Sequence, residues 1–167
     1  MSAGAVCKVE LPEASLLRRY AGEHGYADAY AAEVDRCVPF DAYVESFYTT
    51  RLFALERGVL ALLGRRSSVA QARALARGEL TRFAAWTVEA RGETQLLLAD
   101  DTGRTRSWLH CEPLPGGRTR LYFGSAVVPR TDPRSGQRRL GPVFGALLGF
   151  HQHYSRALLI AALRALP

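Results

Sequence analysis

From residue 82 onward the chain changes from helical to strand-like periodicity, and this change constrains the fold more than any other feature of the sequence. Four runs rich in β-branched and aromatic residues occupy residues 83–91, 94–100, 104–113 and 118–129, with glycine-containing turns between them. Such runs, separated by short turns, are typical of antiparallel hairpins. The sequence therefore predicts a β-meander in this part of the chain.

The segment after the meander has helical periodicity. At 100° per residue, His151 falls in one arc with the apolar side chains of Val143, Leu147, Phe150, Tyr154, Leu158, Ala161 and Ala165. This pattern predicts a long amphipathic C-terminal helix whose apolar face, including His151, lies against the sheet. Leu159, Ile160 and Leu163 fall on the far side of that helix. They indicate either cover by the N-terminal helices or a homodimer interface.

The N-terminal half is expected to contain two strands and several helices. We expect strands at residues 5–11 and 26–34, with a brief helix between them beginning at Pro12. Helices are then predicted over residues 41–78. Asp41 is expected to cap the first of them, a second periodic stretch runs from Leu52 to Leu63, and the last begins with the capping-box spacing of Ser68 and Gln71. The fold class predicted for residues 1–167 is α+β, in a single domain.

Composition sets limits on the class of protein. A chain of 167 residues with 48% hydrophobic and 23% charged residues fits one globular domain. The three cysteines, an odd number, have no metal-binding spacing, so we expect reduced thiols. The sequence has neither a signal peptide nor a transmembrane segment before the last helix, so we expect a cytoplasmic protein; we also expect no metal or other cofactor.

Hairpin register decides which side chains share a face of the sheet. A three-residue turn at 101–103 would place Leu98 opposite Arg106, and a two- or four-residue loop at 115–117 would bring Phe123 and Ser125 to the face of Trp108. A three-residue loop around Gly92 would add Trp86 and Val88. The predicted inner face consists of Trp86, Val88, Leu96, Leu98, Trp108, Leu121, Phe123 and Val127, with the polar residues Arg106, His110 and Ser125 among them.

The order of elements resembles that of the helix-grip fold. The likeness to the START-like (SRPBCC) superfamily, and within it to uncharacterised bacterial families, is carried by residues 106–109, residues 121–127 and the Phe150-His151 pair. The resemblance implies a curved antiparallel meander gripping the long C-terminal helix. It also implies a cavity between helix and sheet for an apolar or aromatic small molecule, but no particular reaction.

The first hypothesis is therefore a small-molecule binding domain. Its expected ligand-binding residues are Trp86, Arg106, Trp108, His110, Phe123, Ser125 and His151, because small-molecule cavities combine apolar walls with a few convergent polar groups. An alternative is a cyclase, dehydratase or hydrolase that uses His151 or His110 as a general base in the same pocket. A core histidine hydrogen-bonded to a neighbour is the favoured interpretation of His151 alone.

Arginine clusters give a third hypothesis. Arg130, Arg134, Arg138 and Arg139 lie in or beside the loop at 130–139, and Arg65, Arg66, Arg73 and Arg77 flank the third helix. A basic surface for nucleic acid or anionic lipid would use such residues. No aromatic residue interleaves with either cluster, as single-strand binding requires, so a solvated surface is the favoured interpretation.

Overall fold

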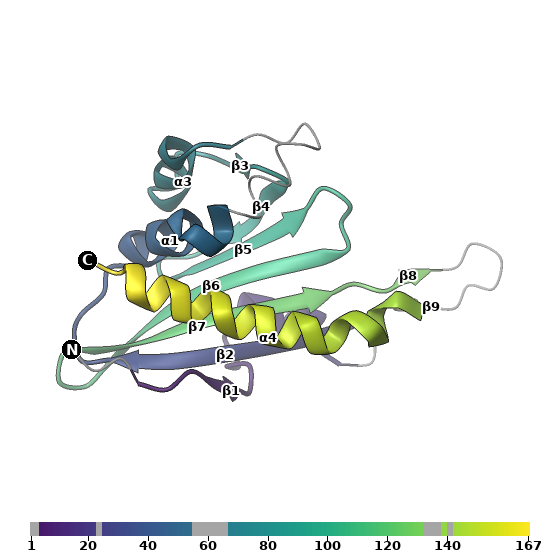
Figure 1. Ribbon diagram of the computed structural model, residues 1–167, viewed down its shortest axis with the longest axis horizontal. Coiled ribbons are helices and arrows are strands. Elements are labelled where there is room, and N and C mark those ends of the chain that lie inside the picture. Colours follow the sequence, from purple (N-terminus) through teal and green to yellow (C-terminus); the bar gives the residue numbers. More distant parts are fainter. Residues whose placement is uncertain (1–3, 23–24, 55–66, 132–137, 140–141) are drawn as a thin grey trace.

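The protein consists of an antiparallel sheet with helices over one face (Figure 1). The computed structural model describes residues 4–22, 25–54, 67–131, 138–139 and 142–167, with residues 130–131, 138–139 and 142–152 described by their backbone alone. Within those ranges seven strands form the sheet, in the order β1-β2-β7-β6-β5-β4-β3. They are β1 (Cys7–Val9), β2 (Tyr26–Val34), β3 (Arg82–Phe83), β4 (Trp86–Arg91), β5 (Gln95–Asp100), β6 (Thr105–Leu114) and β7 (Arg118–Val127).

The helices are η1 (Leu16–Tyr20), α1 (Phe40–Thr49), α3 (Val69–Ala76) and α4 (Pro142–Ala165). The meander, the strand at 26–34 and the long C-terminal helix are confirmed, as is the capping box of Ser68 and Gln71. The predicted helix from Pro12 is reduced to the 3-10 turn η1. Asp41 is not the N-cap of α1, because that position is taken by Pro39. Most of the periodic stretch from Leu52 to Leu63 lies outside the described residues.

The β6–β7 hairpin has a different register from the predicted one. Leu114 pairs with Arg118, so the loop contains three residues, Pro115, Gly116 and Gly117. Both glycines have positive φ, at 79° and 73°, a conformation that side-chain-bearing residues rarely adopt. With these two consecutive residues in the left-handed conformation, the chain reverses direction within a loop of three residues. The expectation of a two- or four-residue loop was therefore wrong, and the two strands pair odd positions with odd positions.

The β5–β6 hairpin also differs from expectation, by one residue. Four residues, 101–104, separate the strands, and Leu98 pairs with Ser107 instead of with Arg106 as predicted. The carboxylate of Asp100 stabilises this longer loop: its Oδ1 accepts hydrogen bonds from the backbone N–H groups of Arg104 (2.8 Å) and Thr105 (2.9 Å). The expected three-residue turn was therefore wrong by one residue.

These registers divide the sheet into two packed faces. The face toward α1 and α4 carries Leu96, Leu98, Leu109, Cys111, Leu121 and Phe123, and Trp86 and Val88 pack beside them. The opposite face carries Trp108, Tyr122, Leu97 and Ala126, which η1 covers with Leu17. The predicted inner face is thus correct for Trp86, Leu96 and Phe123. It is wrong for Trp108, which lies on the other side of the sheet.

Helix α4 packs on β7 and β2 and contacts α1 along its C-terminal half (Figure 1). In the part whose side chains are described, its buried residues are Ser155, Leu158, Leu159 and Ala162. Leu159 is fully buried within the chain, so it cannot take part in the homodimer interface considered from the sequence. Ile160 and Leu163 pack against the same core, to which α1 and α3 contribute buried residues. The N-terminal helices therefore cover this side of α4.

Buried Cys111 leads to a chemical prediction. Cys7 and Cys37 are exposed, whereas Cys111 lies on the helix-facing side of β6, where burial raises the pKa of its thiol to about 12. The thiolate is the reactive form of cysteine. In the folded protein at pH 8 we expect a disulfide reagent such as DTNB to titrate two thiols rapidly, and the third only when urea unfolds the chain. Rapid reaction of three thiols in the native protein would contradict the burial of Cys111.

Candidate functional site

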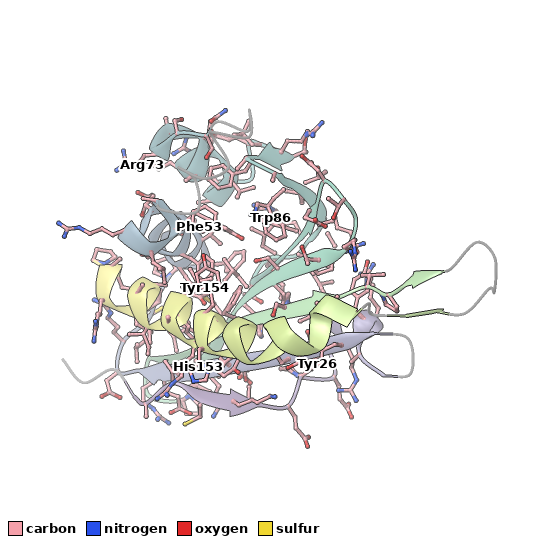
Figure 2. The ribbon with its side chains drawn as sticks, turned by 45° about the vertical axis from the view of Figure 1, so that its right-hand side comes forward. Tyr26, Phe53, Arg73, Trp86, His153 and Tyr154 are labelled. Atoms are coloured by element: carbon pink, nitrogen blue, oxygen red, sulfur yellow. The ribbon has the colours of Figure 1, made fainter. Side chains whose placement is uncertain are left out.

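A cavity of about 190 Å³ lies between the sheet, α1 and α4. Half of the described lining residues are aromatic, and Figure 2 shows three of them, Phe53, Trp86 and Tyr154, between the sheet and the helices. Among the residues whose side chains are described, the lining consists of Phe47, Tyr48, Phe53, Trp86, Thr105, Arg106, Ser107, Phe123, Ser125, Tyr154, Ser155 and Leu158. Side chains from β4, β6, β7, α1 and α4 therefore converge on one small volume, as in other small-molecule sites.

Each wall is positioned by an element whose pattern explains it. Ser107 and Ser125 are directly paired across β6 and β7, so both point to the helix side of the sheet. Phe47 reaches them from α1, and its ring lies 4.8 Å from that of Phe123, centroid to centroid. Tyr154 and Ser155 begin the described part of the buried stripe of α4. His153, next to them in sequence, points to the other side of the helix (Figure 2) and is exposed.

A buried carboxylate stands directly behind the cavity wall. Asp28 of β2 is only 3% exposed, and its two oxygens accept hydrogen bonds from Ser125 Oγ (2.9 Å) and from the hydroxyl of Tyr26 (2.9 Å). Residue 28 was not singled out from the sequence. A signal did exist, because a charged residue occupies the same alternate positions of β2 as Tyr26 and Tyr30, which define its apolar face.

Two lining residues keep buried polar atoms without a partner. The indole Nε1 of Trp86 and the hydroxyl of Ser155 have no hydrogen-bond partner. Ser155 is only 1% exposed. Leaving such a group unsatisfied costs about 1–3 kcal/mol, and most buried polar atoms in folded proteins avoid that cost. Both residues border the cavity, so two unpartnered polar groups are buried in its immediate surroundings.

The structure brings together three of the seven predicted ligand-binding residues, Trp86, Phe123 and Ser125, and places Arg106 at the border of the cavity. The guanidinium of Arg106 is directed to the other face of the sheet. It donates from Nε to Glu89 (2.6 Å) and lies 4.7 Å from the centre of the Tyr20 ring. Arg106 therefore has no charged group in the cavity, contrary to the expectation that it would orient a ligand.

The remaining predicted residues do not reach the cavity. Trp108 and His110 alternate with the cavity-facing residues of β6 and lie on the opposite face. His110 stacks between Trp108 and Tyr122, with ring centroids 5.6 and 5.2 Å away. Its Nδ1 donates to the carbonyl of Thr94 (2.9 Å), since that oxygen can only accept. The side chain of His151 lies outside the described residues.

A second depression, wider and more polar, runs beside β1 on the outer face. It measures about 900 Å³ and is bordered by Arg120, Glu33 and Tyr122. The hydrogen bond from Arg120 holds the pKa of Glu33 below its usual value, and burial raises the pKa of the Tyr122 hydroxyl. These groups satisfy one another: Arg120 Nη2 lies 2.6 Å from Glu33, and Tyr122 donates to Glu112. Arg120, Glu33 and Tyr122 are therefore engaged with neighbouring side chains rather than left for a ligand.

The described residues give little support to a metal site or to a polyanion-binding surface. Among them, no group of three or more His, Cys, Asp or Glu side chains could hold a metal ion. Arg73 is paired with Glu45 and Arg77 with Glu79. Strands β8 (Arg130–Thr131) and β9 (Arg138–Arg139) form a small hairpin beyond the main sheet (Figure 1), but the side chains of its arginines lie outside the description, as do residues 65, 66 and 134.

Comparisons with protein families, with curated proteins and with solved structures found no match to this chain. Among the residues that the structure describes, no helix is both long and apolar enough to cross a bilayer.

Proposed function

We propose that this protein binds a small apolar or aromatic molecule in the cavity between the sheet and helices α1 and α4. The supporting observation is the combination of aromatic walls with the unpartnered Trp86 Nε1 and Ser155 Oγ in a volume of about 190 Å³. A dry engineered cavity of about 150 Å³ accepts benzene, so the available space fits one ring with a small substituent. The function proposed is ligand binding; it includes no reaction.

The helix-grip architecture and membership of the START-like superfamily belong to the same proposal. The antiparallel sheet, the long α4 across it and the cavity enclosed between them are compatible with that arrangement. The cavity has the location that the resemblance of the sequence implies. Of the residues expected to bind the ligand, Trp86, Phe123 and Ser125 keep that role here, and Tyr48, Tyr154 and Ser155 join them.

Neither alternative has a comparable observation in its favour. General-base catalysis in the cavity would need a titratable group within hydrogen-bond distance of the ligand; His110 faces the other side of the sheet, and the side chain of His151, the other candidate base, lies outside the described residues. Binding of nucleic acid or anionic lipid would need arginines free to contact phosphates, whereas Arg73 and Arg77 are engaged by neighbouring carboxylates. We therefore propose ligand binding alone.

Filling the cavity tests the proposal. Ser155→Leu adds a branched apolar side chain at the wall and removes the unpartnered hydroxyl, so we expect the affinity for toluene to fall at least tenfold without loss of stability. The measurement is isothermal titration calorimetry, supported by the ligand-induced rise in Tm that binding to the folded state produces. Ala157→Leu places the same side chain on the exposed side of α4 and should leave toluene binding unchanged.

Tryptophan fluorescence provides an independent check on the location of the site. Trp86 lines the cavity and Trp108 lies on the opposite face, so Trp108→Phe should retain the fluorescence change caused by a bound ligand and Trp86→Phe should lose it. Equal toluene affinity in the wild-type protein and in Ser155→Leu would rule out this cavity as the binding site.

A further inference from the structure

We propose that the cavity selects a neutral single-ring molecule that carries a hydrogen-bond acceptor, such as an amide, carbonyl or hydroxyl group, and that it rejects carboxylates. This inference rests on the proposed function and adds the chemical class of the ligand. It follows from two properties of the cavity: which hydrogen-bonding groups are left unsatisfied, and which charge stands behind the wall.

The unsatisfied groups require an acceptor. Four buried polar side-chain atoms have no partner in the described part of the chain, and two of the four belong to the cavity lining. One of these, Trp86 Nε1, carries a hydrogen and has no lone pair available, so it can only donate. The other, Ser155 Oγ, can donate or accept. A ligand oxygen that accepts from Trp86 would remove the cost of burying an unpartnered donor.

Charge excludes an anionic acceptor. Both oxygens of the buried Asp28 side chain accept hydrogen bonds, and one of the two donors, Ser125, lines the cavity, so a carboxylate lies directly behind the wall. Within the described lining, the one basic side chain is that of Arg106, and its guanidinium is bound to Glu89 on the other face. A buried ligand carboxylate would therefore lie close to a second carboxylate and would find no counterion among the described lining side chains, in a site whose low dielectric strengthens the repulsion.

The aromatic walls also disfavour an anionic ligand. The faces of Phe, Tyr and Trp rings carry partial negative charge, and six such rings belong to the described lining of the cavity. A cationic amine would suit both those faces and Asp28, but an ammonium group has donors and no acceptor. It would leave Trp86 Nε1 unsatisfied. A neutral molecule with an acceptor is the class that meets all of these conditions.

The test compares benzamide, benzoate, benzylammonium and toluene as probes of the full-length protein at pH 7, by calorimetry and by ligand-observed NMR. Benzamide and benzoate have the same number of heavy atoms and differ mainly in charge. We expect benzamide to bind at least tenfold more tightly than benzoate or benzylammonium. Binding of benzoate or of benzylammonium as tight as that of benzamide would overturn the inference.

Variants identify the donor. Trp86→Phe keeps an aromatic wall and removes the N–H group, so it should weaken benzamide about tenfold and toluene less than threefold. Ser155→Ala, which removes a hydroxyl without a partner, should retain the fold and weaken benzamide more than toluene. Equal losses for the two probes in both variants would refute the assigned hydrogen bonds. If toluene binds, and benzamide and benzoate bind equally tightly, the ligand class is wrong and the proposed function stands. If no probe binds, the proposed function fails as well.

Discussion

Gly124→Ala is expected to destabilise the protein by about 1–3 kcal/mol, near the upper end of that range, because the backbone of β7 passes directly beneath a packed cluster. A Cβ at this position would lie 2.8 Å from Leu17 Cδ2, 2.8 Å from Trp108 Cε3 and 3.0 Å from the carbonyl oxygen of Asp28. Trp108 is paired with Gly124 across the sheet and is fully buried, so it cannot move aside. Urea unfolding monitored by circular dichroism gives the free energy of unfolding.

Gly92→Ala is the matched control for this substitution. A Cβ on Gly92 has no atom within 4 Å, and its φ is not positive. Alanine there should leave stability within about 1 kcal/mol of the wild type, in the stabilising direction, because it reduces the entropy of the unfolded chain. If both variants unfold at the same urea concentration, the close approach at Gly124 is not what the structure indicates.

Trp108→Ala is expected to cost about 3–5 kcal/mol, a large part of the roughly 5–15 kcal/mol that stabilises an ordinary domain. Trp108 is 0% exposed, and its Nε1 donates to Gln95 Oε1 at 2.9 Å. The same amide oxygen accepts from the backbone N–H of Leu16 at 3.0 Å, so Gln95 joins the indole to the segment that covers this face. Truncation would leave a cavity beneath η1 and remove one of these bonds.

The loss should appear as a lower urea midpoint with little change in the affinity for toluene per folded molecule, since Trp108 lies on the face away from the ligand cavity. Trp108→Phe, which retains most of the ring volume, should lose less stability than the alanine variant. Val69→Ala, at an apolar residue that is 39% exposed, should stay within about 0.5 kcal/mol of the wild type. A cost below about 1 kcal/mol for Trp108→Ala would contradict the packing of the outer face.

Periodicity was sufficient to predict strand β2, the meander and the long C-terminal helix, because each of these elements buries its own pattern of side chains. Strand β2 begins and ends at the residues expected from its alternation, and the capping box at Ser68 begins α3 as its spacing requires. Hairpin register could not be predicted in the same way, because it depends on loop length. The conformation of Gly116 and Gly117, and the hydrogen bonds of Asp100, decide that length in three dimensions.

The errors in hairpin register also affected the prediction of the candidate site. A shift of one residue moves a side chain to the other face of a sheet, so Trp108 and His110 were predicted for the wrong side. Trp86, Phe123 and Ser125 were predicted on the correct face, because the alternation of side chains along β4 and β7 identified the positions that face the helices. Asp28 and Ser155 were missed for a different reason. Their importance comes from what surrounds them, a buried carboxylate behind the wall and a hydroxyl without a partner, and neither property can be read from residue spacing.

The sheet separates two sets of side chains that have different physical roles. Leu17, Trp108 and Gly124 on one side contribute stability through close packing, whereas the residues lining the cavity on the other side leave space and two unsatisfied groups. Substitutions at sites that share no contacts have nearly additive effects on stability. Changes that alter which molecule the cavity accepts can therefore accumulate while the outer face keeps the protein above the stability that folding requires. A lineage with this architecture can diverge in ligand while its fold is retained.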